Sequence, residues 1–394
     1  MTTRVLIAGG GTGGHVFPMI AVGEALVAER PGVEVTYVGT GRGIESRVVP
    51  EVGGTLETLD VLPLRGRGVR GFLRGTIRAV MVMKEARDLV RRVQPDVVFS
   101  VGGYAAGPVT LAAKSCGVPV TLMEPNAVLG FTNRILARLV RRAYVCFPEA
   151  KRGFADGVVR FTGVPLRRRF EPRAYAPQEP LRVLVMGGSQ GAKALGEILP
   201  EAFAALVGEG RALAILHQAG RDKTEEVEAR YQALGIADQV RVTAFIDDVA
   251  LALAEADLVI ERSGAGSLAE LTAVGRPAVL VPYPYAADDH QRKNAESLAE
   301  AGAAVCLPQS EATVARMTEV LRELVADEAR RQRMAEAAAA RGRPDAARAV
   351  ARDLLALGDA YRGRDLAFAP DLDGSTGEGP LERRLVAPAG EVAP

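Results

Sequence analysis

The stretch RVLIAGGGTGGHVFP at residues 4–18 joins a short apolar run to a glycine-rich loop and the start of a helical segment. The same order returns at residues 181–199, which read LRVLVMGGSQGAKALGEIL. An apolar run, a glycine loop and a helix in this order are typical of a parallel strand in an α/β fold. Because the theme occurs twice, the sequence predicts an α/β chain with two doubly wound domains.

Further apolar runs alternate with helical stretches in both halves of the chain. The runs EVTYVG, DVVFSVGG, VPVTLM and AYVCF are predicted strands of the first half, and LAILHQAG, QVRVTAFID, PAVLVPYP and AAVCLP of the second. The stretches FPMIAVGEALVAER, GPVTLAAKSCG and GFTNRILARLV are predicted helices of the first half. Ligands on such sheets bind at the carboxyl ends of the strands, so we expect the site in the cleft between the halves. The predicted divisions are a first domain over 1–163 completed by a helix at about 343–360, a linker over 164–180, a second domain over 181–342, and a disordered tail over 361–394.

Composition narrows the class of protein. The chain has 394 residues, of which 48% are hydrophobic, and its 49 basic and 48 acidic residues leave a net charge of +1. This balance gives no global case for nucleic-acid binding. The three cysteines are far apart and predict a reducing, cytoplasmic setting. We find no signal-peptide pattern at the start and no apolar run long enough to span a bilayer.

The first glycine loop has two competing interpretations. Gly9, Gly11 and Gly14 match the spacing of a dinucleotide-binding loop. Such a fold also needs an acid at the end of its second strand, where this chain has Val38, Gly39 and Thr40. We therefore expect a cradle for another anion, made by backbone N–H groups at a helix start, with a simple tight turn as the alternative.

His15 closes this loop in the first turn of the predicted helix. A helix N-terminus disfavours imidazolium, so we expect a neutral ring that can accept a proton as a general base. A capping or core histidine is the alternative. By contrast, His217 is predicted to end a buried strand, and His290 lies among polar loop residues.

Four more loops follow predicted strands. SVGGYAAGP (100–108) and MEPNAVLGFTN (123–133), with Asn126, belong to the first half. GGSQGA (187–192) offers the Ser189 hydroxyl, and ERSGAGSLAE (261–270) opens a helix whose free amides suit a diphosphate. Glu270 is placed to bind vicinal ribose hydroxyls, although an acid early in a helix also compensates the helix dipole. Gln291 and Asn294, in DDHQRKNA (288–295), suit sugar hydroxyls, with a solvated helix start as the alternative.

An arginine-rich segment at 65–92 has apolar residues interleaved with its basic ones. This pattern predicts an amphipathic helix that lies on an anionic membrane surface, with an ordinary basic surface helix as the alternative. The residues expected to face the membrane are Arg70, Phe72, Leu73, Arg74, Ile77, Arg78 and Met81.

Taken together, these segments closely resemble the MurG family, the bacterial N-acetylglucosaminyltransferases of glycosyltransferase family 28 that make lipid II for peptidoglycan. The resemblance runs from residue 4 to about 358, through GGTGGHVFP, PLRGRGVRG, PDVVFSVGGYAAGP, EPNAVLGFTNR, GGSQGA, FIDDV, RSGAGSLAE and HQRKNA in family order. It implies a GT-B fold, with two Rossmann-like domains whose parallel sheets face an interdomain cleft. The first domain would hold the acceptor and associate with the membrane, and the second would bind UDP-GlcNAc.

The resemblance also implies the reaction and the site. GlcNAc passes from UDP-GlcNAc to the MurNAc 4-hydroxyl of undecaprenyl-pyrophosphoryl-MurNAc-pentapeptide, lipid I, with inversion to a β-1,4 linkage. Its catalytic residues would be His15, Glu270 and Gln291. The donor contacts would be Thr12, Gly13, Gly14, Asn126, Arg167, Ser189, Ile246, Ala265, Gly266, Ser267, Leu268, Ala269, Glu270 and Gln291, and the acceptor contacts would be His15, Gly103, Tyr104 and Asn126. Pro125, Val164, Gly266 and Ser267 depart from the family pattern, which affects details of side-chain contact.

No cofactor is implied, because UDP-GlcNAc is a substrate and no carboxylate pair is placed to bind a metal. The expected location is the cytoplasmic face of the bacterial plasma membrane, as a peripheral protein of cell-wall biogenesis, cell shape and cell division. Other cell-wall and division proteins are further candidate partners. The alternatives are a UDP-GlcNAc 2-epimerase and another GT-B glycosyltransferase with a lipid acceptor.

Overall fold

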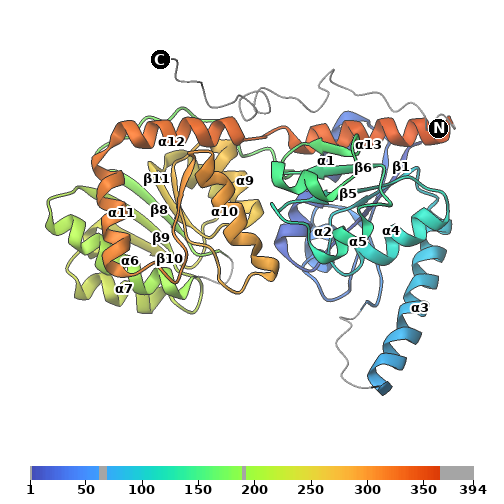
Figure 1. Ribbon diagram of the computed structural model, residues 1–394, viewed down its shortest axis with the longest axis horizontal. Coiled ribbons are helices and arrows are strands. Elements are labelled where there is room, and N and C mark those ends of the chain that lie inside the picture. Colours follow the sequence, from blue (N-terminus) through green and yellow to red (C-terminus); the bar gives the residue numbers. More distant parts are fainter. Residues whose placement is uncertain (1, 62–68, 189–191, 364–394) are drawn as a thin grey trace, which may run out of the picture. The chain divides into compact units, whose positions relative to one another are not determined.

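The computed structural model describes residues 2–61, 69–188 and 192–363, and for residues 69–79 it describes the backbone only. Two compact units make up the chain (Figure 1). The first comprises residues up to 125, residues 129–167 and the chain from 345 onward, and the second comprises residues 126–128 and 168–344. Each unit holds one parallel sheet with helices on both faces, so the prediction of two doubly wound α/β domains is confirmed.

The first unit contains a sheet of seven strands in the order β3-β2-β1-β4-β5-β6-β7. Its strands are β1 Arg4–Ala8, β2 Glu34–Gly39, β3 Thr55–Thr58, β4 Val97–Ser100, β5 Val120–Glu124, β6 Arg142–Val145 and β7 Val159–Phe161. Its helices are α1 Gly13–Glu29, α2 Glu45–Glu51, α3 Val69–Val93, α4 Ala106–Ser115, α5 Phe131–Leu136, the short 3-10 helix η1 Pro148–Gly153, and α13 Ala346–Arg362.

The second unit contains a sheet of six strands in the order β10-β9-β8-β11-β12-β13. Its strands are β8 Leu181–Met186, β9 Leu213–Gln218, β10 Val240–Thr243, β11 Leu258–Glu261, β12 Ala278–Leu280 and β13 Ala304–Cys306. Its helices are α6 Lys193–Gly208, α7 Thr224–Ala233, η2 Ala237–Gln239, α8 Val249–Glu255, α9 Ala265–Val274, η3 Ala287–Asp289, α10 His290–Glu300, α11 Val314–Ala326 and α12 Glu328–Arg341.

In both sheets the direction of winding reverses beside the first strand. The strand β1 lies between β2 and β4, and β8 lies between β9 and β11. Loops that follow the two strands at such a switch point diverge to opposite faces and leave room for a ligand. The loops after β1, β4, β8 and β11 are therefore the places in each unit where a site is expected.

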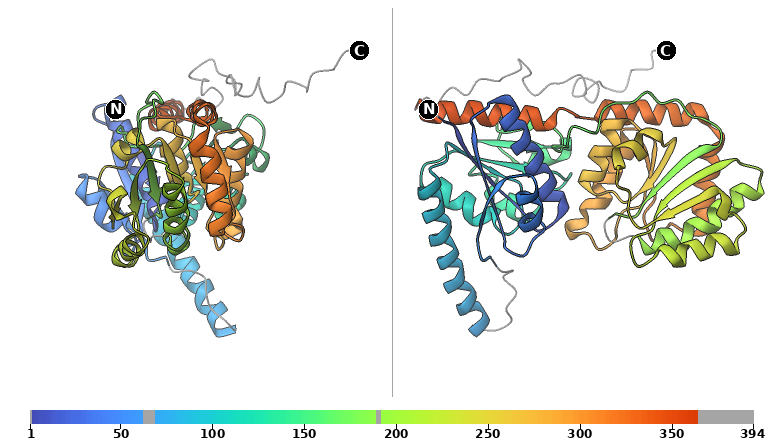
Figure 2. Two further views of the ribbon diagram at one scale, coloured as in Figure 1. Left: turned by 90° about the vertical axis from the view of Figure 1, so that its left-hand side faces the viewer. Right: turned by 180° about the vertical axis from the view of Figure 1, so that it is seen from behind.

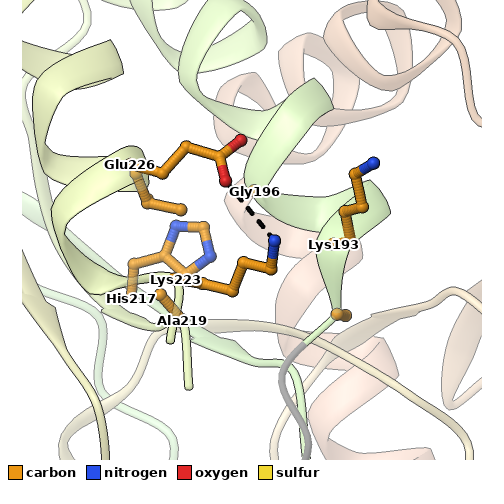
Figure 3. A pocket seen from close by; sticks show the side chains of 8 residues that line it. Lys193, Gly196, His217, Ala219, Lys223 and Glu226 are labelled. Atoms are coloured by element: carbon orange, nitrogen blue, oxygen red, sulfur yellow. Dashed lines mark hydrogen bonds and ion pairs between the residues drawn. The ribbon is translucent and has the colours of Figure 1, made fainter. Parts of the chain in front are cut away.

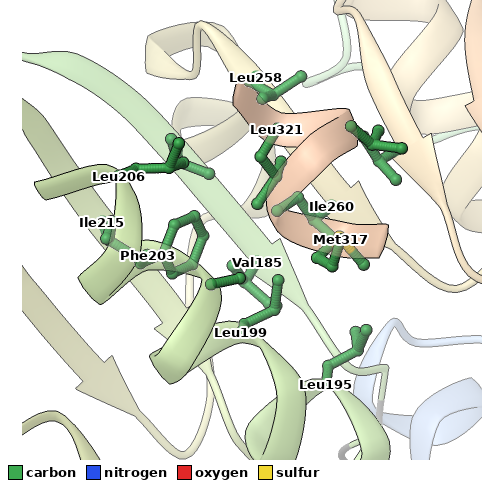
Figure 4. Close-up of a cluster of buried hydrophobic side chains, with 14 of the residues drawn as sticks. Val185, Leu195, Leu199, Phe203, Leu206, Ile215, Leu258, Ile260, Met317 and Leu321 are labelled. Atoms are coloured by element: carbon green, nitrogen blue, oxygen red, sulfur yellow. The ribbon is translucent and has the colours of Figure 1, made fainter. Parts of the chain in front are cut away.

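The core of the second unit shows why its apolar positions are spaced as they are. Four residues on one face of α6, namely Leu195, Leu199, Phe203 and Leu206, repeat at intervals of three or four and are 0–1% exposed (Figure 4). They pack with strand residues Val185, Ile215, Leu258 and Ile260 and with Met317 and Leu321 of α11. Side chains alternate between the faces of a strand, so the intervening strand residues support the helices of the other face.

The last helix, α13, packs on the first unit. Figures 1 and 2 show α13 running along the first unit. Its buried residues include Val350, Ala351 and Leu354, which share a core cluster with α1 and β1. Asp359 accepts two hydrogen bonds of 2.7 Å from the Arg30 guanidinium at the end of α1. Asp353 accepts a hydrogen bond of 2.8 Å from the Tyr144 hydroxyl.

Within the described residues, none of the helices combines the length and apolar character needed to cross a membrane. The three cysteines are all free thiols.

Candidate active site

The glycine loop after β1 turns at two residues whose backbone conformation only glycine adopts readily. Gly10 and Gly11 have φ of 139° and 91°, which turn the chain from the end of β1 into α1. Thr12 then precedes the helix in an extended conformation, and its carbonyl accepts the amides of His15 and Val16, each at 3.1 Å. The exposed Thr12 and Gly14 and the half-buried Gly13 therefore lie at the amide end of α1, and the anion cradle at this loop stays a prediction.

His15 lies on the first turn of α1 with its ring held against the loop. Its Nδ1 is 3.2 Å from the carbonyl oxygen of Gly10. A carbonyl oxygen only accepts, so this contact requires the proton on Nδ1 and leaves the lone pair on Nε2. The first turn of α1 carries no acidic residue. His15 is thus a half-buried imidazole beside the glycine loop, with Nδ1 turned to the Gly10 carbonyl, and its role as a base stays a prediction.

The loop after β4 packs directly on this arrangement. Gly102 and Gly103 have φ of 100° and 90°. A Cβ atom on Gly103 would lie 2.5 Å from the Gly10 carbonyl oxygen, and one on Gly102 would lie 3.1 Å from His15 Nε2. The glycine pair is therefore required for close approach, and it brings Gly103 and the 58% exposed Tyr104 to the same loop edge as His15.

Glu45 is a site residue that the sequence analysis missed. It is 0% exposed at the start of α2, and its carboxylate accepts from Gly11 N at 2.9 Å, from Thr40 N at 2.8 Å and from the Thr40 hydroxyl at 2.9 Å. Burial opposes its charge, but these donors outweigh burial and lower the pKa of the carboxyl. The signal in the sequence is a glutamate that follows Gly39, at the end of β2, and the loop glycines Gly41 and Gly43.

The guanidinium of Arg167 stacks over an aromatic ring. Its guanidinium lies 5.2 Å from the ring centroid of Phe17, which is 41% exposed on α1. A cation over an aromatic face is held without a carboxylate partner. Both residues belong to the first unit. Arg167, a predicted donor contact, therefore lies over α1 at Phe17, two positions after His15.

The loop after β5 is tied at both ends by buried polar groups. Glu124 is 1% exposed, and it accepts from Gly130 N and from the Asn133 side chain, both at 2.9 Å. Asn126 belongs to the short piece 126–128 that clusters with the second unit. There its side-chain oxygen accepts from Asn294 Nδ2 at 3.1 Å, while Ala127 N donates to Asn294 Oδ1 at 2.8 Å.

Asn294 is itself fully buried, and its amide also donates to the Ser263 carbonyl at 3.2 Å. Because the donors and the acceptor of this side chain are all bonded inside the protein, it orients neighbouring residues and is not placed to bind a sugar. The amide of Asn294 is suited to sugar hydroxyls by type, but here it fixes residues 126 and 127 and the loop after β11.

The start of α9 supplies the free amides expected for a diphosphate. The first helical bond runs from Leu268 N to Gly264 O at 3.0 Å, so the amides of Ala265, Gly266 and Ser267 precede it and are free of the helix ladder. Leu268 is 1% exposed, so its side chain belongs to the core. Ala269 and Glu270 are half-buried on the second turn, and Glu270 is therefore one turn from the amides.

Gln291 is positioned by the same loop. Its backbone carbonyl accepts from the Ser263 hydroxyl at 2.7 Å, and its side-chain oxygen accepts from Tyr283 N at 3.0 Å. The side-chain nitrogen is the group that can donate to a sugar hydroxyl. Ile246 lies half-buried in the loop after β10.

For several predicted site residues, the residue or its side chain lies outside the part of the chain that the structure describes. Ser189 falls outside the described residues. The segment 65–92 is helical over α3, as predicted, but the side chains of Arg70, Phe72, Leu73, Arg74, Ile77 and Arg78 are not described. At its described end Met81 is 57% exposed and Val80 is 65% exposed.

The other two histidines have different surroundings. His217 ends β9 at 1% exposure, as predicted, beside a small pocket lined by Lys193, Lys223 and Glu226 (Figure 3). Its Nδ1 is 2.9 Å from the Tyr231 hydroxyl, and burial lowers its pKa to about 4. His290 is half-buried at the start of α10, where Nδ1 contacts the Ala287 carbonyl at 2.7 Å.

Among residues 2–61, 69–188 and 192–363, the structure has no cluster of three or more His, Cys, Asp or Glu side chains that could hold a metal ion.

Comparison with known proteins identifies the family. The glycosyltransferase family 28 N-terminal domain matches residues 5–145, and the family 28 C-terminal domain matches residues 182–350. A relative from Sorangium cellulosum (strain So ce56), a UDP-N-acetylglucosamine--N-acetylmuramyl-(pentapeptide) pyrophosphoryl-undecaprenol N-acetylglucosamine transferase, is 57% identical over 94% of this chain and 92% of its own length. A relative with the same name from Myxococcus xanthus (strain DK1622) is 42% identical over 88% of this chain and 91% of its own length.

Solved structures agree with these relatives. The crystal structure of Acinetobacter baumannii MurG has a TM-score of 0.76 at 32% identity and covers 90% of this chain and 99% of that one, which confirms the GT-B fold class. A UDP-N-acetylglucosamine 2-epimerase has a TM-score of 0.61 at 13% identity, with coverage of 90% and 96%, and this likeness concerns the fold alone. The two family domains and the relatives together show that the chain belongs to glycosyltransferase family 28 and, within it, to the MurG N-acetylglucosaminyltransferases.

Proposed function

We propose that this protein transfers GlcNAc from UDP-GlcNAc to the MurNAc 4-hydroxyl of lipid I and so forms the β-1,4 linkage of lipid II. The observation that carries the proposal is the 57% identity, over 94% of the chain, to a relative named for this transfer. The two glycine-loop sites support it, because one unit has the imidazole of His15 beside its loop and the other has helix amides outside the hydrogen-bond ladder, followed by the carboxylate of Glu270.

The proposed reaction is a single in-line displacement. The acceptor oxygen forms a bond to the anomeric carbon while the bond to the diphosphate oxygen breaks, and UDP takes the electron pair. His15 Nε2 receives the proton of the attacking hydroxyl. The amides of Ala265, Gly266 and Ser267 stabilise the charge that develops on the leaving diphosphate. Glu270 accepts from the ribose hydroxyls, and Gln291 donates to the GlcNAc hydroxyls.

The test measures UDP release from UDP-GlcNAc with and without a short-chain lipid I analogue. We expect release only with the analogue, and a β-linked disaccharide as the product. Release of UDP without the analogue would indicate hydrolysis, and N-acetylmannosamine in place of the disaccharide would indicate an epimerase. Either result would overturn the transfer. We also propose that no metal is required, so EDTA should leave the rate unchanged.

We further propose that the protein acts at the cytoplasmic face of the plasma membrane, as a peripheral protein of peptidoglycan synthesis during growth and division. The support is the basic, apolar pattern of α3 and the exposure of Val80 and Met81 at its described end. Anionic lipid attracts each basic residue near the membrane surface by about 1 kcal/mol. Apolar residues strengthen binding further because their side chains insert into the bilayer interface.

Flotation with phosphatidylglycerol vesicles tests this location. Charge reversal at Arg70, Arg74 and Arg78 should abolish flotation at physiological salt. A matched control reverses Arg168, Arg169 and Arg173, three exposed arginines far along the chain, and should float like the wild type. If the first variant floats as well as the control, α3 is not the anchor.

A further inference from the structure

One peptide unit of the glycine loop is held from both sides. The N–H of Gly11 donates to Glu45 Oε2 at 2.9 Å, and the C=O of Gly10 is 3.2 Å from His15 Nδ1. These two groups belong to the same planar peptide bond, whose N–H and C=O point in opposite directions. The carboxylate of Glu45 and the imidazole of His15 therefore lie at the two ends of one amide.

The structure holds Glu45 tightly in its charged form. Its three donors are Gly11 N, Thr40 N and the Thr40 hydroxyl, at 2.8–2.9 Å. Three glycines enclose the carboxylate arm. A Cβ on Gly10 would lie 2.3 Å from Oε1, one on Gly39 would lie 2.5 Å from Cγ, and one on Gly43 would lie 2.0 Å from Oε2. This cavity fits a glutamate and leaves no room for it to turn away.

A carboxylate that accepts from the N–H of a peptide unit makes the C=O of the same unit a stronger hydrogen-bond acceptor. Charge-assisted hydrogen bonds are about twice as strong as neutral ones, and hydrogen bonds in a chain polarise one another. The Gly10 carbonyl is thereby a better acceptor for His15 Nδ1–H than an ordinary carbonyl. It also disfavours the other tautomer, because a lone pair on Nδ1 would face the carbonyl oxygen.

The loop after β4 closes the arrangement from the far side. Gly103 lies against the Gly10 carbonyl, and Gly102 lies under His15 Nε2. The carbonyl is therefore fixed between the imidazole, the Gly102–Gly103 pair and the amide that Glu45 holds. All of these groups belong to the first unit.

We propose that Glu45 is a positioning residue for His15, acting through the Gly10–Gly11 peptide to hold the Nδ1–H tautomer with Nε2 as the basic nitrogen. This inference rests on the role of His15 in the proposed function. In the transfer step the acceptor hydroxyl gives its proton to Nε2, its oxygen bonds the anomeric carbon, and UDP departs with the electron pair. The polarised peptide stabilises the imidazolium that forms, as a buried carboxylate does when it contacts a catalytic histidine directly.

The first test reads the tautomer in the wild-type protein. The chain has only three histidines, so selective ¹⁵N-histidine labelling gives a spectrum that His15→Ala assigns by the loss of one set of signals. We expect the neutral ring of His15 to be protonated on Nδ1. In Glu45→Gln the signals should move toward a mixture of tautomers. A wild-type ring protonated on Nε2, or a folded Glu45→Gln protein with unchanged His15 signals, would overturn the proposal.

The second test separates positioning from fold. Glu45→Gln should lower kcat by roughly 10- to 100-fold, the usual cost of removing a group that orients a catalytic one. Its Kd for UDP should stay within about twofold of the wild type. The control is Glu51→Gln, since Glu51 ends the same helix with a side chain 60% exposed and pairs with Arg47 at 3.7 Å. The Glu51→Gln protein should match the wild type in kcat and in its ¹⁵N-histidine spectrum.

The double variant supplies the decisive comparison. If Glu45 acts through His15, then His15→Ala with Glu45→Gln should be no slower than His15→Ala alone. Losses that multiply would mean a separate structural role for Glu45 and would overturn the proposal. A His15→Ala protein with near-normal turnover would instead end the base assignment of the proposed function, and the wild-type tautomer would still report on the contact itself.

Discussion

The three histidines of this chain lie in three different environments, and the titration of the buried His217 bears on the stability of the second unit. Burial lowers its pKa to about 4, whereas an unfolded chain has a histidine pKa of about 6.5. As the pH falls from 6.5 toward 4, the unfolded state takes up a proton and the folded state does not. Stability is therefore lost over this window, by at most about 3 kcal/mol.

His217→Gln should flatten this dependence. The amide can still bond the Tyr231 hydroxyl, but it does not titrate. We expect a smaller loss of stability between pH 7 and pH 5 in this variant than in the wild type, measured by urea unfolding of the second unit. The control is His290→Gln, at a half-buried position on α10, which should keep the wild-type dependence. Equal slopes in His217→Gln and the wild type would contradict the assignment.

Glu261 is a buried carboxyl that the proposed chemistry does not use. It is 1% exposed at the end of β11, and both of its oxygens are without a hydrogen-bond partner. Burial, and then the charge of Glu270, raise its pKa well above the ordinary value. Because the folded pKa lies above the unfolded one, the contribution of Glu261 to stability falls as the pH rises from about 4.5 through its folded pKa.

Glu261→Leu removes this penalty and should raise the free energy of unfolding at pH 8 by about 1–3 kcal/mol. Thermal and urea unfolding measure the change. Glu255→Leu, at an exposed position on α8, should change stability by less than about 0.5 kcal/mol. A destabilised Glu261→Leu protein would mean that the carboxyl is well bonded in solution.

Single residues also mark the limit of prediction from sequence. The loops, His15 and the turn before Glu270 follow from local pattern, because glycines and helix starts are local features. The roles of Glu45 and Asn294 depend on contacts across 34 and 167 positions of the chain, with Gly11 and Ala127. No local pattern distinguishes them from polar residues in solvent.

Among the elements, the strands with continuous apolar runs were predicted, whereas two edge strands were not. β3 (TLET) and β7 (VRF) have four and three residues and are only partly buried. An edge strand has one neighbour and less core to cover, so its sequence lacks a strong apolar signal. The segment GFTNRILARLV was predicted to be a helix, and α5 forms only over Phe131–Leu136.

The element with the clearest energetic consequence is α13. Leu354 is 0% exposed in the cluster that α13 shares with α1 and β1. Leu354→Ala should destabilise the first unit by about 2–5 kcal/mol, because a cavity remains where the side chain packed. Leu251→Ala, at a position 54% exposed on α8, should have little effect. Unfolding of the first unit at the wild-type denaturant midpoint in Leu354→Ala would show that α13 is not part of its core.

For the whole molecule, the repeated order of strand, glycine loop and helix predicted both sheets, because each unit winds the same way from its first strand. Each unit also has its own core cluster, so side chains at the two glycine-loop sites are held by separate cores. His15 belongs to the first unit and Glu270 to the second. This division predicts that the chemistry and the affinity for UDP can be changed independently.

His15→Ala should reduce kcat by roughly 10²- to 10⁴-fold, the range for loss of a general base, while its Kd for UDP by calorimetry stays within about twofold of the wild type. Glu270→Ala should raise the Kd for UDP by about tenfold or more, because the ribose hydroxyls lose a charged acceptor. At saturating donor its kcat should fall far less than that of His15→Ala. Weakened UDP binding in His15→Ala would place the imidazole in the nucleotide site, and unchanged UDP affinity in Glu270→Ala would exclude the ribose contact.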